Sequence, residues 1–115
     1  MAESAEAIVA TALRATGIPF YPDVGQMGST GSYLTYQSVG GQDVNDMSGP
    51  ADLENARMQV NAWAVTRAGA IAALRSARTA LVAVGGLPIG APVSTYESDT
   101  KLYGSRLDFS LWFKP

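Results

Sequence analysis

The sequence predicts an α+β fold in which two helices pack on one face of a four-stranded sheet, mixed but mainly antiparallel, with a long loop at 40–53. Two amphipathic helical stretches, two long alternating strands and the glycines between them lead to this prediction. The final strand, residues 101–113, has the clearest pattern. Its apolar side chains alternate with mostly polar ones: Leu107, Phe109, Leu111 and Phe113 against Arg106, Asp108, Ser110 and Trp112.

Each predicted helix has one apolar stripe that a sheet face can cover. The first spans residues 2–15, where Ile8, Val9 and Leu13 recur at helical spacing before Gly17. The second spans residues 67–84, with Thr66 as its N-cap. Its predicted buried face holds Ile71, Leu74, Arg78 through its aliphatic stem, and Leu81, with Ala70, Ala73 and Ala77 beside them. Since the strands alternate rather than being continuously apolar, both helices are expected on the same face.

The other strands are predicted from β-branched and aromatic runs at residues 33–39, 54–65 and 93–97. The first two of these pair antiparallel across the loop at 40–53, and the last two strands of the chain form a hairpin. Segments 18–32 and 87–92 are rich in Gly and Pro and are predicted to be loops. Because Leu102 and Leu107 differ in parity, a β-bulge is predicted at Gly104.

Composition narrows the possible functions. The chain has 115 residues, which suits a single domain over 1–115, and it contains neither Cys nor His. Thiolate and imidazole chemistry is therefore excluded. The net charge is −2, and the Lys and Arg residues are scattered rather than gathered into a nucleic-acid footprint. The acidic N-terminus and the short apolar stretches predict neither a targeting segment nor a membrane span.

No motif in the chain predicts catalysis, a cofactor or a metal ion. The glycine-rich segment 25–31 resembles a phosphate loop but lacks the required lysine. Asp43, Asp46 and Asp52 offer oxygen ligands for calcium, but their spacing does not match an EF-hand, so a solvated acidic loop is favoured. We therefore expect a protein that is not an enzyme.

Two tryptophans stand out because both fall on the mostly polar faces of their strands. Trp63 and Trp112 lie there beside Arg57 and Arg106, and Trp and Arg are enriched at interface hot spots. Either the loop at 40–53 or the N-terminal loop covers the tryptophans, or another subunit does, and both hold if the long loop of one subunit covers the sheet of its neighbour. The predicted interface residues are Asp43, Asn45, Asp46, Met47, Arg57, Trp63, Arg106 and Trp112.

Three pieces of the sequence, in this order and spacing, carry a family resemblance. They are the tyrosine–glutamine strand at 33–37, the tryptophan-ended strand at 57–64 before the alanine-rich helix, and the acidic turn at 96–103 that leads into the alternating strand at 106–113. Over residues 6–114 the chain resembles the tail-completion or tail-terminator proteins of long-tailed phages and phage-like particles.

The resemblance implies a structural virion protein that forms a homo-oligomeric ring, hexameric in such proteins, at the head–tail junction. The ring would end polymerisation of the tail tube protein and offer a surface to the head-side connector or stopper protein. DNA would pass through the lumen without specific binding, and assembly would take place in the host cytoplasm. No catalytic residue carries over from the family.

Two other interpretations stay open at this point. A head-completion or stopper protein on the capsid side would keep the ring but move it across the joint. A small ligand-binding or enzymatic α+β domain would instead place its site in the segment 25–31.

Overall fold

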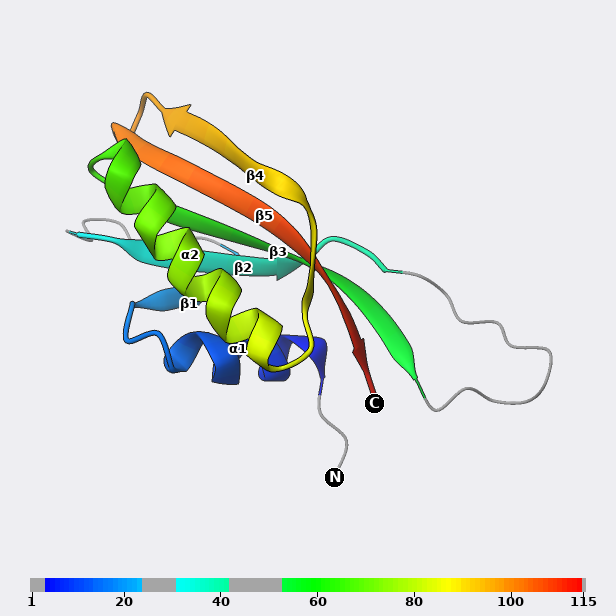
Figure 1. The fold of residues 1–115 in the computed structure, drawn as a ribbon. Helices are drawn as coiled ribbons and strands as arrows, with labels where there is room; N and C mark the ends of the chain where they lie inside the picture. Colours follow the sequence, from blue (N-terminus) through cyan, green and yellow to red (C-terminus); the bar gives the residue numbers. More distant parts are fainter. Residues whose placement is uncertain (1–3, 24–30, 42–52, 115) are drawn as a thin grey trace.

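The chain folds into one mixed sheet with two helices on one of its faces (Figure 1). The structure is a computed structural model that describes residues 4–23, 31–41 and 53–114. Its elements are α1 (Ala5–Arg14), β1 (Phe20–Pro22), β2 (Tyr33–Ser38), β3 (Glu54–Ala64), α2 (Arg67–Ala83), β4 (Leu87–Glu97) and β5 (Leu102–Phe113). The α+β class and the placement of both helices on one face agree with the prediction from sequence.

The sheet has five strands in the order β1-β2-β3-β5-β4, not the four that were predicted. The additional strand is β1, which pairs parallel with β2 inside the segment expected to be a loop. The remaining pairs are antiparallel: β2 with β3, β3 with β5, and β4 with β5. Since β3 and β4 both run opposite to β5, the α2 crossover joins two parallel strands across it.

The predicted bulge at Gly104 is wrong. The register between β3 and β5 is unbroken from the pair Glu54–Phe113 to the pair Ala64–Tyr103. The irregularity lies instead in β4, between Ile89 and Val93. The predicted loop at 87–92 is also wrong, because these residues belong to the long edge strand β4. Proline is tolerated there because an edge strand leaves one row of backbone groups unpaired.

The core lies between the two helices and the apolar face of the sheet. β3 and β5 supply its centre, where Met58, Val60 and Phe109 are almost completely buried. From the helices come Val9, Ala12, Leu13, Ala73, Leu74, Ala77 and Leu81. Several of these are alanines, and their small side chains let α2 approach the sheet closely. The alternation predicted for residues 106–113 is confirmed, since Leu107, Phe109 and Leu111 are buried.

The helix ends follow ordinary capping chemistry. The Ser4 side chain accepts a hydrogen bond from the backbone N–H of Ala7, and Thr66 accepts one from that of Gly69. The predicted buried face of α2 needs one correction. Ile71 and Arg78 are exposed, and the buried stripe consists of Ala70, Ala73, Leu74, Ala77 and Leu81. The stripe is narrower than predicted because α2 packs through its alanines.

Candidate assembly surfaces

Both helices cover the same face of the sheet, so the described helices leave the other face, called here the outer face, without a layer over it (Figure 1). Four of the predicted interface residues, Arg57, Trp63, Arg106 and Trp112, share this face because of the strand register. The other four, Asp43, Asn45, Asp46 and Met47, lie outside the described residues.

A polar ladder crosses the middle of the outer face. The guanidinium Nε of Arg57 lies 2.7 Å from Oδ2 of Asp108, and Gln59 Nε2 donates to Oδ1 of the same carboxylate over 3.1 Å. Gln37 and Asn61 each place a side-chain nitrogen 3.5 Å from Oε1 of Gln59. Water still reaches the charged groups of the ladder, because the Arg57 side chain is 49% exposed and that of Asp108 is 16% exposed. Its net contribution to stability is therefore small.

The two tryptophans lie at opposite ends of the ladder. Trp63 is opposite Gly104, and Trp112 is opposite Asn55, eight residues further along β5. At a strand rise of about 3.3 Å per residue, this places them about 26 Å apart. They therefore cannot form a single hot spot, and each has to be considered separately.

The chain itself accounts for the position of Trp63. Its indole Nε1 donates to Thr35 Oγ1 over 3.3 Å, and Thr35 is buried even though it faces outward. The ring also lies against the backbone of Gly104. Trp112 is different, because it is 40% exposed. Trp63 thus has contacts within its own sheet, which neither alternative drawn from the sequence described, whereas Trp112 keeps a large exposed surface.

The sequence prediction missed an apolar strip along β4. Leu87, Ile89 and Val93 pair with outward-facing residues of β5, so they extend the outer face, and they are 58%, 38% and 48% exposed. Leu87 pairs with Ser110, two residues from Trp112. An exposed row of large apolar side chains on an edge strand is typical of an interaction surface. The apolar strip was not predicted from the sequence because the prolines of this segment are typical of a loop.

An aromatic group surrounds the opposite end of the sheet. The rings of Tyr96 and Tyr103 are 4.9 Å apart, and the guanidinium of Arg67 lies 5.5 Å above the ring of Tyr103. Tyr21 and Tyr33 meet edge to face at 6.0 Å. Burial raises the pKa of Tyr33, and the nearby Glu97 and Tyr21 raise it further.

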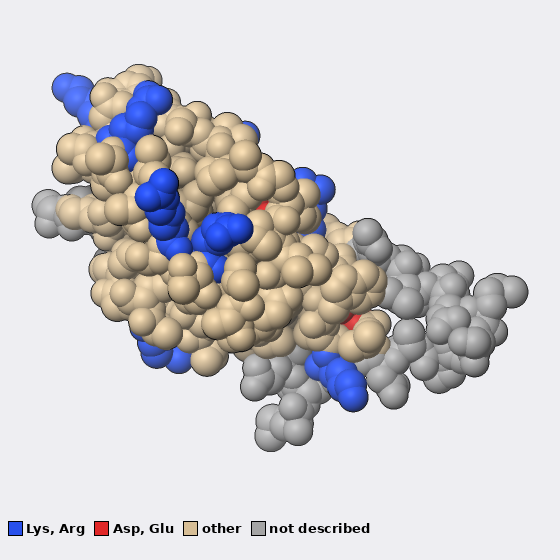
Figure 2. Space-filling view, viewed as in Figure 1, with Lys and Arg blue, Asp and Glu red and all other residues tan. Residues whose placement is uncertain are grey.

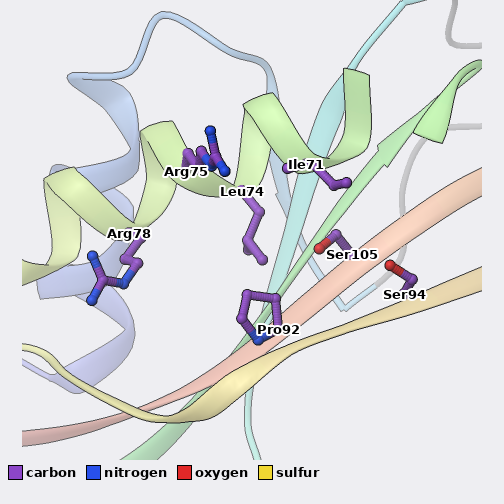
Figure 3. Close-up of a pocket in the computed structure, with 7 residues that line it drawn as sticks. All are labelled: Ile71, Leu74, Arg75, Arg78, Pro92, Ser94 and Ser105. Carbon is purple, nitrogen blue, oxygen red and sulfur yellow. The ribbon is translucent and has the colours of Figure 1, made fainter. Parts of the chain in front are cut away.

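A groove opens on the helix side, between α2 and the strands β4 and β5 (Figure 3). Its volume is about 230 Å³, and its lining residues are Ile71, Leu74, Arg75, Arg78, Pro92, Ser94 and Ser105.

Within residues 4–23, 31–41 and 53–114, no three acidic side chains gather where a metal ion would bind. None of the helices described is long and apolar enough to span a membrane.

The comparison with protein families gives a match that covers nearly the whole chain. The model for the family described as "Tail completion protein gp17" matches residues 4–114. No curated protein matches the chain. The family match confirms the resemblance drawn from the strands at 33–37, 57–64 and 106–113.

Proposed function

Because this chain belongs to the tail completion protein gp17 family and therefore has a structural role in a phage tail, we propose that it forms a homo-hexameric ring at the head-proximal end of the tail tube. The ring ends tube polymerisation by occupying the surface that another tube ring would need. Its opposite side meets the head-side connector or stopper protein. The protein is assembled in the host cytoplasm and stays at the head–tail junction of the virion.

The observation that carries this proposal is the outer face, which neither described helix covers, together with its apolar strip. A head-to-tail ring needs two different patches on each subunit, because each interface joins unlike surfaces. The strip Leu87–Ile89–Val93 with Trp112 supplies one patch, at the β4 edge. The predicted residues Asp43, Asn45, Asp46 and Met47 belong to the other patch in this proposal.

A structural function also agrees with the chemistry of the surfaces. Part of the charge on the outer face is neutralised in the Arg57–Asp108 pair, and the exposed Arg106 lies among amides, hydroxyls and apolar groups. Such a surface suits protein contacts. DNA passes through the lumen of the proposed ring without being bound specifically, since weak attraction permits movement.

Deleting the gene from the phage and imaging the particles tests the proposal. We expect tails of uncontrolled length without heads, because nothing then stops the tube. Tails of normal length beside filled heads that lose their DNA would instead assign the protein to the capsid side of the joint. Normal, infectious particles would contradict both roles.

The ring itself is tested by native mass spectrometry on the purified protein and on tails from the wild-type phage. Six copies are expected at the tail end. The variant Trp112→Ala should assemble less well, whereas Trp63→Phe, which changes a ring packed within its own chain, should assemble normally. Equal assembly of both variants with the wild type would remove Trp112 from the interface.

A further inference from the structure

The groove beside α2 combines an apolar floor with two arginines on its rim. Leu74 points from α2 toward the strands, where Pro92, Ser94 and Ser105 form the other wall (Figure 3). Arg75 and Arg78 flank Leu74 on the exposed side of the helix. The groove therefore suits a peptide that carries both an apolar side chain and carboxylates.

Neither arginine has an acidic partner among the residues described. The ion pair that the described residues form, Arg57–Asp108, lies on the outer face and not at the groove. Two further arginines of the helix side lie over aromatic rings, Arg14 over Phe20 and Arg67 over Tyr103. Figure 2 shows Lys and Arg spread over the helix-bearing surface with almost no Asp or Glu in view. This surface is cationic although the whole chain carries a net charge of −2.

The complementary charge is present in the chain's own sequence. Segment 42–52 lies outside the described residues and contains Asp43, Asp46 and Asp52, no Lys or Arg, and the apolar residues Val44 and Met47. All the Lys and Arg residues of the chain lie in its described part. We propose that the groove binds segment 42–52 of a second copy, which specifies one contact of the ring proposed above and rests on that ring.

The length of the segment argues for a second copy over the same chain. Gly41 lies against Asn55, and Leu53 directly precedes β3, whereas Ser105 in the strand wall of the groove is level with Ala62. Reaching that level and returning takes a path of about 16 strand residues, or about 53 Å. The chain from 41 to 53 has twelve peptide steps and spans about 42 Å at most. Segment 42–52 is therefore too short to extend to Ser105 of its own chain and return, which favours the groove of a second copy.

A nucleic acid is the rival occupant, because arginines also bind phosphate. The apolar lining residues Ile71, Leu74 and Pro92 favour a peptide, since a phosphate backbone gains little from contact with such side chains. Because both occupants are anionic, both should bind more weakly when the two arginines become glutamates. The test below therefore separates them by a peptide of reversed charge and by competition with duplex DNA.

The test measures fluorescence anisotropy of a labelled peptide with the sequence of residues 41–53. The protein is the full chain with Asp43, Asp46 and Asp52 changed to Asn, so that its own segment does not compete. We expect saturable binding that weakens as salt rises. The double variant R75E/R78E should bind at least tenfold more weakly, and R75Q/R78Q should give an intermediate affinity. The matched control R14E/K114E, with the same change of charge at residues outside the groove and the outer face, should bind like the parent.

Charge exchange completes the test. A peptide with Lys at positions 43, 46 and 52 should bind R75E/R78E and not the parent protein. Absence of binding at low salt, equal binding to R75E/R78E, or binding of duplex DNA that the acidic peptide does not displace would each overturn the proposal. Circular dichroism confirms that the variants are folded.

Native mass spectrometry separates this proposal from the proposed function. If the R75E/R78E variant still formed the ring, the proposed groove contact would be contradicted and the proposed ring would stand. Peptide binding without any ring on tails would instead contradict the proposed function.

Discussion

Gly104 offers the sharpest test of the packing on the outer face. It lies in β5 directly opposite Trp63, and the indole of Trp63 occupies the space that a side chain at position 104 would fill. A Cβ there would be 2.8 Å from Cζ3 of Trp63 and would also press against Oγ1 of Thr95. We therefore predict that Gly104→Ala destabilises the protein.

The magnitude follows from two opposing effects. Forcing an extra carbon into a packed site costs about 1–3 kcal/mol. Replacing Gly by Ala also restricts the unfolded chain, which returns about 0.4–1 kcal/mol. Thr95 can turn its hydroxyl away, but Trp63 is held by its hydrogen bond to Thr35, so the steric effect dominates. The expected net loss in free energy of unfolding is about 0.5–2 kcal/mol.

Urea unfolding followed by tryptophan fluorescence measures this loss. Arg106→Ala is the matched control, because it removes an exposed side chain from the same face of the same strand and should change stability by less than about 0.5 kcal/mol. In a Trp63→Leu background, Gly104→Ala should cost at least about 0.5 kcal/mol less than in the wild type. If Gly104→Ala left stability unchanged or raised it, or cost the same in both backgrounds, the close contact would not have the importance given to it.

Three further predictions concern the core, the polar ladder and pH. Phe109→Ala should lower the free energy of unfolding by about 3–5 kcal/mol in urea titrations, since the ring is 1% exposed. Asp108→Asn should lower it by no more than about 1 kcal/mol, because Arg57 is half exposed, and high salt should remove the difference. Burial raises the pKa values of Tyr33 and Tyr36, so the fold favours the neutral phenols; the urea midpoint should hold below about pH 10 and fall as the pH rises through the raised pKa values, less so when both residues are Phe.

Most of the elements were predictable because their signals are local. The alternation of residues 106–113 and the helical spacing around Leu13 and Leu74 follow directly from the backbone geometry of strands and helices. Strand β1 was missed because it has only three residues, of which the last is Pro22, and because Pro19 directly precedes it. Its pairing with β2 is a contact with residues further along the chain. Strand β4 was missed because Pro88 and Pro92 are ordinary signs of a loop. Only its place at the sheet edge makes them acceptable in a strand.

The candidate surfaces were predicted less completely. Parity alone placed Arg57, Trp63, Arg106 and Trp112 on one face, and the structure agrees. The structure also shows that Trp63 and Trp112 are too far apart to form one hot spot. Their separation depends on the register of β3 against β5, which the sequence does not contain. The strip Leu87–Ile89–Val93 became visible only once β4 was known to be a strand at an open edge.

The sequence by itself determined the α+β class, the two helices, the alternating strands and the family, because periodicity and spacing are properties of the chain alone. Tertiary structure decided what those patterns leave exposed. Ile71 and Arg78 have the spacing of buried residues, yet they line a groove because the alanines of α2 bring the helix to the sheet along another line. The sequence around Gly104 suggests a β-bulge, yet the lack of a side chain at Gly104 makes room for the ring of Trp63. Both outcomes depend on distances between elements far apart in the chain, and a local pattern does not contain those distances.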